Sequence, residues 1–110
     1  MLYDGALRFM EEGKAAILAK DLPEQDRNLQ RAQKIVLHLM GTLDHEKGGQ
    51  IADNLKALYL YVLDQLVKAN IYDQAERVDE AIRTFSELRS GWAELEKRTK
   101  NQGSGQLVAA

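Results

Sequence analysis

The sequence IADNLKALYLYVLDQLVKAN, residues 51–70, decides the fold of this 110-residue chain. Its apolar residues recur at steps of three and four, the spacing that stacks side chains on one face of an α-helix. These residues are Ile51, Leu55, Leu58, Tyr59, Val62, Leu63, Leu66 and Val67. They cover roughly half of the helix circumference, whereas a stripe of about 100° is enough to seat a helix on one core. We therefore expect a neighbour or a partner to cover the additional apolar surface.

Three other segments, 2–18, 29–43 and 75–95, show the same helical spacing, and short polar connections separate all four. The chain contains one proline, Pro23, and it is rich in Ala, Leu, Glu, Lys, Gln and Arg, the residues that favour helices. Short connections make consecutive helices antiparallel neighbours. The sequence therefore predicts an all-α fold, a single antiparallel up-down-up-down four-helix bundle over residues 1–98.

Polar residues mark the predicted helix ends. Asp21 and Glu24 fit a capping box at the start of the second helix, and Asp73 and Glu76 fit another at the start of the fourth. The polar run 44–49 ends in two glycines and predicts a short turn between the second and third helices.

The two ends of the chain depart from the bundle pattern. The first helix begins inside its own apolar repeat without a capping residue, so we expect its start to be truncated. From Thr99 the sequence becomes Lys-Asn-Gln-Gly-Ser-Gly, a composition typical of flexible linkers. We expect residues 99–110 to form a flexible tail.

Charge and composition narrow the choice of partners and compartment. The formal net charge is −2 and the basic residues are scattered, which argues against nucleic acid and anionic membranes as partners. No apolar run reaches the length of a membrane span, and the N-terminus lacks the layout of a signal peptide. The chain has no cysteine. These features favour a cytoplasmic protein.

The sequence contains no recognisable catalytic, cofactor or metal site. Di-metal sites in helical bundles use Glu-x-x-His pairs, which are absent here. His38 lies on a polar helix face and His45 in a turn, so both are interpreted as structural or solvent-exposed. Arg89 falls within the apolar stripe of the fourth helix, where we expect its stem to pack and its head to reach water or a carboxylate. We predict that the protein is not an enzyme.

Several short motifs, in order along the chain, closely resemble the FliS family of flagellar export chaperones from Leu2 to about Lys97. The matching residues are Leu2, Tyr3, Asp4, Gly5, Ala6 and Phe9, then Glu46, Lys47, Gly48 and Gly49, then Asn54, Leu55, Leu58, Tyr59 and Tyr61, and finally Ala69, Asn70 and Trp92. The resemblance implies a helical bundle in the bacterial cytoplasm that binds the C-terminal segment of flagellin. It also implies that the chaperone keeps flagellin from polymerising early and helps deliver it to the export gate of the flagellar type III apparatus. Family members carry a further segment ahead of the first motif, which this sequence lacks.

The wide apolar faces and this resemblance both lead us to expect a hydrophobic groove that binds the client. An amphipathic segment binds by laying its apolar face in a hydrophobic groove. The candidate client-binding residues are Leu7, Val36, Met40, Leu55, Tyr59, Val62 and Leu63. The competing interpretation for any one of them is an ordinary core position, because core and groove residues share the same spacing.

A rival hypothesis is a scaffolding bundle that pairs with another copy of itself and has no client. We expect the chaperone to be a monomer or a weak homodimer. A stable dimer that does not bind flagellin would favour the scaffold. A monomer that forms an equimolar complex with flagellin would favour the chaperone.

Overall fold

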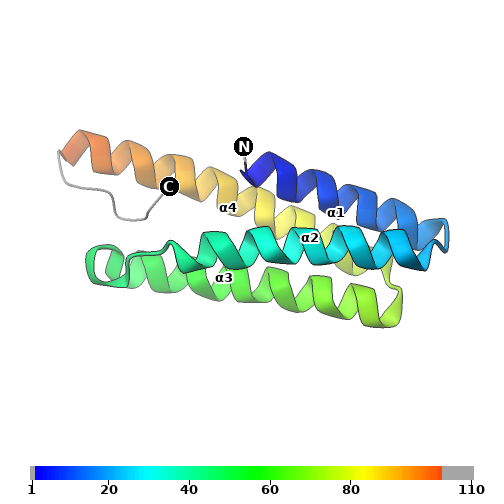
Figure 1. The fold of residues 1–110 in the computed structure, drawn as a ribbon. Coiled ribbons are helices and arrows are strands. Elements are labelled where there is room, and N and C mark those ends of the chain that lie inside the picture. The colour runs from blue at the N-terminus through cyan, green and yellow to red at the C-terminus, as the bar shows by residue number, and fades with distance from the viewer. Residues whose placement is uncertain (1, 103–110) are drawn as a thin grey trace.

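Four helices account for almost all of the described chain. The computed structural model describes residues 2–102, and the side chains of His45 and of residues 92–102 lie outside this description. The helices are α1 (Leu2–Leu18), α2 (Leu22–Gly41), α3 (His45–Tyr72) and α4 (Ala75–Gln102). They run alternately in opposite directions along one long axis (Figure 1). The predicted all-α fold is therefore confirmed.

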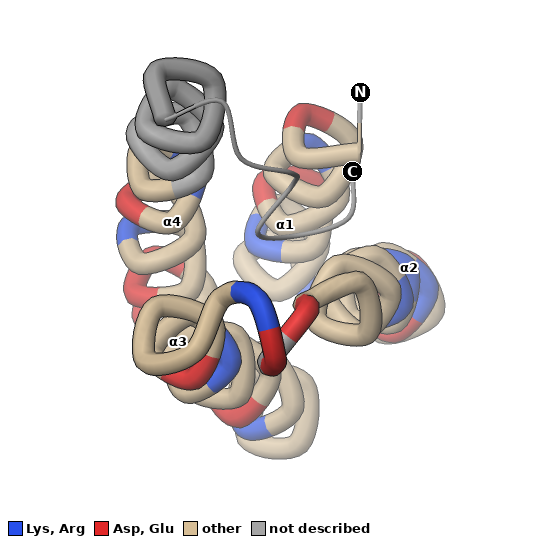
Figure 2. The backbone as a smooth tube through the Cα atoms, turned by 90° about the vertical axis from the view of Figure 1, so that its left-hand side faces the viewer, with Lys and Arg blue, Asp and Glu red and all other residues tan. Residues whose placement is uncertain are grey.

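The helices form a closed ring around one core. Within the described residues α1 packs on α2, α2 on α3, α3 on α4 and α4 back on α1, while the backbones of the diagonal pairs stay apart, with no Cα atoms within 8 Å of each other. The end-on view in Figure 2 shows the same order of helices. This arrangement is the antiparallel four-helix bundle that the sequence predicts.

An aromatic cluster joins three of the helices. Tyr59 of α3 and Phe85 of α4 are fully buried, and their ring centroids lie 6.5 Å apart. The ring of Tyr3 from α1 stacks on Phe85 with 4.4 Å between centroids. The hydroxyls of Tyr3 and Tyr59 are hydrogen-bonded at 2.6 Å. Burial, together with this hydrogen bond, raises the pKa of Tyr3, because both disfavour the charged phenolate.

Two ion pairs connect α1 to α4 on the bundle surface. Lys14 Nζ lies 2.7 Å from Asp79 Oδ1, and Arg89 Nη1 lies 2.9 Å from Asp4 Oδ1. The Arg89 head thus reaches a carboxylate, one of the two positions that the sequence predicts. Exposed pairs of this kind stabilise a fold by about 0–1 kcal/mol each, so the buried core contributes more to holding α1 in place.

The start of α2 follows part of the predicted capping pattern. The Asp21 carboxylate accepts a hydrogen bond from the backbone N–H of Glu24 at 3.3 Å, as a capping residue does. The Glu24 carboxylate instead pairs with Arg27 at 2.7 Å. The N-terminal cap is confirmed, whereas Glu24 turns toward its own helix.

The other helix ends differ more from the predictions. Asp73 does not start α4, because it adopts a left-handed conformation with φ of 56° and caps the C-terminus of α3. The predicted turn 44–49 is largely helical: Asp44 caps α3, and only Gly49, with φ of 52°, interrupts the helix. At its C-terminus α4 includes residues 99–102, which were predicted to belong to the tail. The rest of that tail, 103–110, lies outside the described residues.

Alanine substitution at two glycines of α1 is expected to change the free energy of unfolding in opposite directions. A Cβ at Gly13 would lie 2.6 Å from Leu29 Cδ2 and 2.9 Å from Leu29 Cγ, which is too close for any side chain. A Cβ at Gly5 would lie 3.8 Å from Ile35 Cδ1, an ordinary contact. We expect Gly5→Ala to raise the free energy of unfolding by about 0.5–1 kcal/mol, because alanine favours helices.

We expect Gly13→Ala to lower the free energy of unfolding, because an overpacking cost of about 1–3 kcal/mol outweighs the helix preference of about 1 kcal/mol. Urea denaturation followed by circular dichroism measures both changes. An increase in stability for both variants would contradict the close approach of α1 and α2 at Gly13.

Candidate functional site

The seven predicted client-binding residues lie in the core or at its edge. Val36, Leu55, Tyr59 and Val62 are buried. Leu7, Met40 and Leu63 are partly buried and pack against the same core. In this structure the seven side chains are therefore packed in or against the core and do not line an open groove. Their contact with a client stays a prediction.

The surplus of apolar surface on the third helix is nevertheless present. Eleven large apolar side chains are exposed among the described residues, and seven of them belong to α3. These seven are Ile51, Leu58, Leu60, Tyr61, Val67, Ile71 and Tyr72. The wide apolar arc predicted for residues 51–70 thus exceeds what the core uses, but it exposes residues other than the predicted set.

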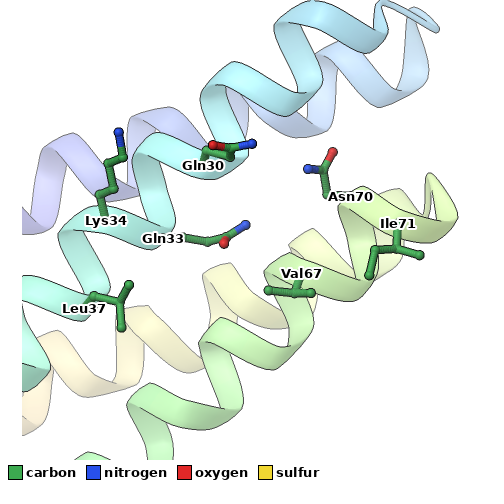
Figure 3. A pocket seen from close by; sticks show the side chains of 7 residues that line it. All are labelled: Gln30, Gln33, Lys34, Leu37, Val67, Asn70 and Ile71. Carbon is green, nitrogen blue, oxygen red and sulfur yellow. The ribbon is translucent and has the colours of Figure 1, made fainter.

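The part of this surplus that faces α2 forms a hollow. A pocket of about 280 Å³ lies between α2 and α3, as Figure 3 shows, with Gln33 extending from α2 toward Val67 of α3. We call this surface the α2–α3 groove and define it by Gln30, Gln33, Lys34, Leu37, Val67, Asn70 and Ile71. The apolar members are open to solvent, with exposed fractions of 51% for Leu37, 39% for Val67 and 64% for Ile71. Leu60, seven residues before Val67 on α3, is 48% exposed and extends this apolar face.

A hydrogen-bond network fixes one end of the α2–α3 groove. The Asp26 Oδ1 atom accepts hydrogen bonds from Gln30 Nε2 at 2.8 Å and from Asn70 Nδ2 at 2.9 Å. The bond from Asn70, followed by that from Gln30, lowers the pKa of Asp26 because both bonds favour the charged carboxylate. Gln25, which is buried, donates to Asn70 and Asp73 from its side-chain amide. These bonds tie α2 to the end of α3, so the groove is preformed there.

Four of the family-motif residues make side-chain contacts that the structure describes. Tyr3 belongs to the aromatic cluster and Asp4 pairs with Arg89. Tyr61 donates a hydrogen bond of 3.0 Å from its hydroxyl to Glu80 of α4, and Asn54 accepts one of 2.8 Å from Gln50. These four residues lie on different faces and do not converge on one site.

Five further motif residues lie near the starts of α1 and α3. Leu2 is exposed at the start of α1, next to Gly5, which faces Ile35. Lys47 and Gly48 form the first turn of α3, where the backbone N–H of Lys47 donates to the capping Asp44. The positive φ of Gly49 explains a glycine there, because other residues rarely adopt that conformation. The side chain of Trp92 lies outside the described residues.

The described residues show no other chemistry that would define a site. They hold no group of three His, Cys, Asp or Glu side chains that could bind a metal ion. His38 is exposed on α2. Over the same residues, no helix combines the length and the apolar character that crossing a membrane requires.

Comparison with known proteins points to one family. The family model described as "Flagellar protein FliS" matches residues 1–99. The flagellar secretion chaperone FliS of Campylobacter jejuni is 36% identical over 95 residues, which cover 86% of this chain and 74% of that protein. FliS of Salmonella typhimurium is 30% identical over 105 residues, covering 94% of this chain and 78% of the relative. FliS of Bacillus subtilis is 30% identical over 110 residues, covering 98% and 81%.

Proposed function

We propose that this chain, which belongs to the FliS family of flagellar secretion chaperones, binds the C-terminal segment of flagellin in the α2–α3 groove. One observation carries the proposal: Leu37, Val67 and Ile71 form a solvent-open apolar hollow on an otherwise well-packed bundle. Exposed apolar surface rimmed by polar groups is typical of protein interaction sites. The amides of Gln30, Gln33 and Asn70 supply that polar rim.

The shape of the α2–α3 groove suits an amphipathic helix. From Leu60 to Ile71 the exposed apolar face of α3 runs for about 16 Å at 1.5 Å per residue, or three helical turns. A client helix lying between α2 and α3 would place residues at i, i+3 or i+4, and i+7 against this face. The packed core beneath and the Asp26 network keep the groove open before the client arrives, which lowers the entropic cost of binding.

Covering the apolar face of the client explains a chaperone's effect. A flagellin segment whose apolar side lies in the α2–α3 groove cannot pack against another flagellin at the same time. Binding therefore prevents early polymerisation and keeps the segment in a form that can be delivered to the flagellar type III export apparatus. This role places the protein in the bacterial cytoplasm.

Titration calorimetry with the C-terminal segment of flagellin from the same genome tests the proposal. We expect saturable, equimolar binding with a negative heat-capacity change, because apolar surface leaves water on binding. Sedimentation of the same samples should show a monomer or a weak homodimer that converts to a one-to-one complex. A stable homodimer that gives no heat with the segment would contradict the proposal and favour a scaffold.

A further inference from the structure

The outward face of α2 carries a basic stripe, although the whole chain has a net charge of −2. Arg27, Arg31, Lys34 and His38 recur at steps of four, three and four, so they share one helix face, and all four are exposed. Residues 27–43 contain no Asp or Glu. Figure 2 shows basic residues along the outer side of α2. We call these four residues the α2 basic stripe.

Lys34 connects the basic stripe to the α2–α3 groove. It is the one charged residue in the pocket lining, and it makes no ion pair within the described residues. In Figure 3 its ammonium lies on the α2 edge of the pocket and points away from α3. A charge in that position remains available to a partner that lies in the groove.

The basic surface continues from the stripe onto α1. The Arg31 guanidinium lies 5.5 Å from the ring centroid of Phe9, and that of Arg8 lies 5.2 Å from the same ring. This contact holds the two positive charges at the surface. Arg27, by contrast, is neutralised by Glu24.

The opposite edge of the groove has a different charge pattern. On α3 the Lys68 ammonium lies 3.0 Å from the Asp64 carboxylate, so these two exposed charges satisfy each other. The α2 edge of the groove therefore carries the positive charge of Lys34, whereas Asp64 and Lys68 pair with each other on α3. The Asp26 carboxylate lies at one end of the groove, where Gln30 and Asn70 donate to it. An occupant with charge on one edge would be oriented by this difference.

We propose that the occupant of the α2–α3 groove is an amphipathic helix that carries acidic residues along the edge lying over α2. This inference rests on the proposed function and specifies the chemistry of the client. The apolar face of the client supplies most of the affinity, while the stripe speeds association and selects one orientation. Each exposed pair adds little to the affinity, about 0–1 kcal/mol, so the clearest signature is in the association rate.

Stopped-flow measurement of association with the flagellin C-terminal segment tests this inference. We expect Arg31→Glu combined with Lys34→Glu to slow association about tenfold at low salt, and the difference to shrink as salt screens the charges. Arg83→Glu, an exposed change of the same sign on α4, serves as the control and should leave a much faster rate. Replacing the acidic residues of the segment with lysine should restore fast association with the double variant.

The possible outcomes separate the inference from the proposed function. Suppose that the wild-type chain binds the segment and that the double variant associates as fast as Arg83→Glu. The inference that the client carries acidic residues over α2 is then overturned, and the groove remains the client site. If the double substitution instead abolishes binding to phosphatidylglycerol vesicles or to an RNA oligonucleotide and leaves the segment unaffected, the stripe serves another ligand and the inference is overturned. If the wild-type chain does not bind the segment, the proposed function fails, and the inference fails with it.

Discussion

Tyr59→Ala is expected to lower the free energy of unfolding by about 3–5 kcal/mol, the usual cost of removing a buried aromatic ring. Tyr59 is fully buried in α3, beside Phe85 of α4, and its hydroxyl bonds to that of Tyr3 from α1. One side chain therefore joins three helices. Because small domains are stable by only about 5–15 kcal/mol, this variant should be close to unfolded at elevated temperature.

Urea denaturation measures the effect, with Tyr59→Phe as the matched control. Phenylalanine keeps the ring and removes only the hydroxyl, so its cost should be about 1 kcal/mol, the typical contribution of one hydrogen bond. A similar loss for both variants would mean that the hydroxyl bond, and not ring packing, dominates at this position. A loss below about 1 kcal/mol for alanine would contradict the burial of Tyr59.

Leu37→Asp combined with Val67→Asp is expected to weaken binding of the flagellin C-terminal segment by about 30-fold or more. The two side chains face the same hollow from α2 and α3, so the substitutions place charges where the client's apolar face would lie. A loss of 2 kcal/mol, the usual threshold for a dominant interface residue, corresponds to about 30-fold in Kd. Titration calorimetry measures the change.

The fold itself should tolerate these substitutions, because both side chains are substantially exposed. Leu18→Asp is the matched control: Leu18 is 68% exposed at the end of α1 and does not line the groove. We expect this control to bind like the wild-type chain, and circular dichroism should show all three proteins equally helical. Equal binding of the segment by the control and the double variant would mean that the client site lies outside the α2–α3 groove.

The sequence was sufficient to predict the bundle because helical spacing and short connections restrict the topology strongly. Residues 51–70 correctly indicated a long helix with more apolar surface than one core uses. The spacing could not say which residues were surplus. Leu55, Tyr59 and Val62 lie at the centre of the apolar arc and are buried, whereas Leu60 and Ile71 lie off this centre and are exposed.

The site itself depends on how two helices meet, which no single periodic pattern contains. In the sequence Gln30 and Gln33 look like ordinary surface residues of a helix. In the structure they line a pocket together with residues of α3, namely Val67 and Ile71. The residue Asp73 was predicted to begin α4, but its left-handed backbone ends α3 instead, and its carboxylate accepts from Gln25 of α2. A capping pattern is local, whereas that hydrogen bond joins residues far apart in the sequence.

Photo-crosslinking from the α2–α3 groove tests whether the flagellin segment lies in this groove. A photoreactive benzoylphenylalanine replaces Leu37 in one variant and Leu18 in another, and each is irradiated with the flagellin C-terminal segment. We expect a covalent adduct with the segment from position 37 and none from position 18. Binding of the segment with an adduct from position 18 and none from position 37 would contradict this expectation.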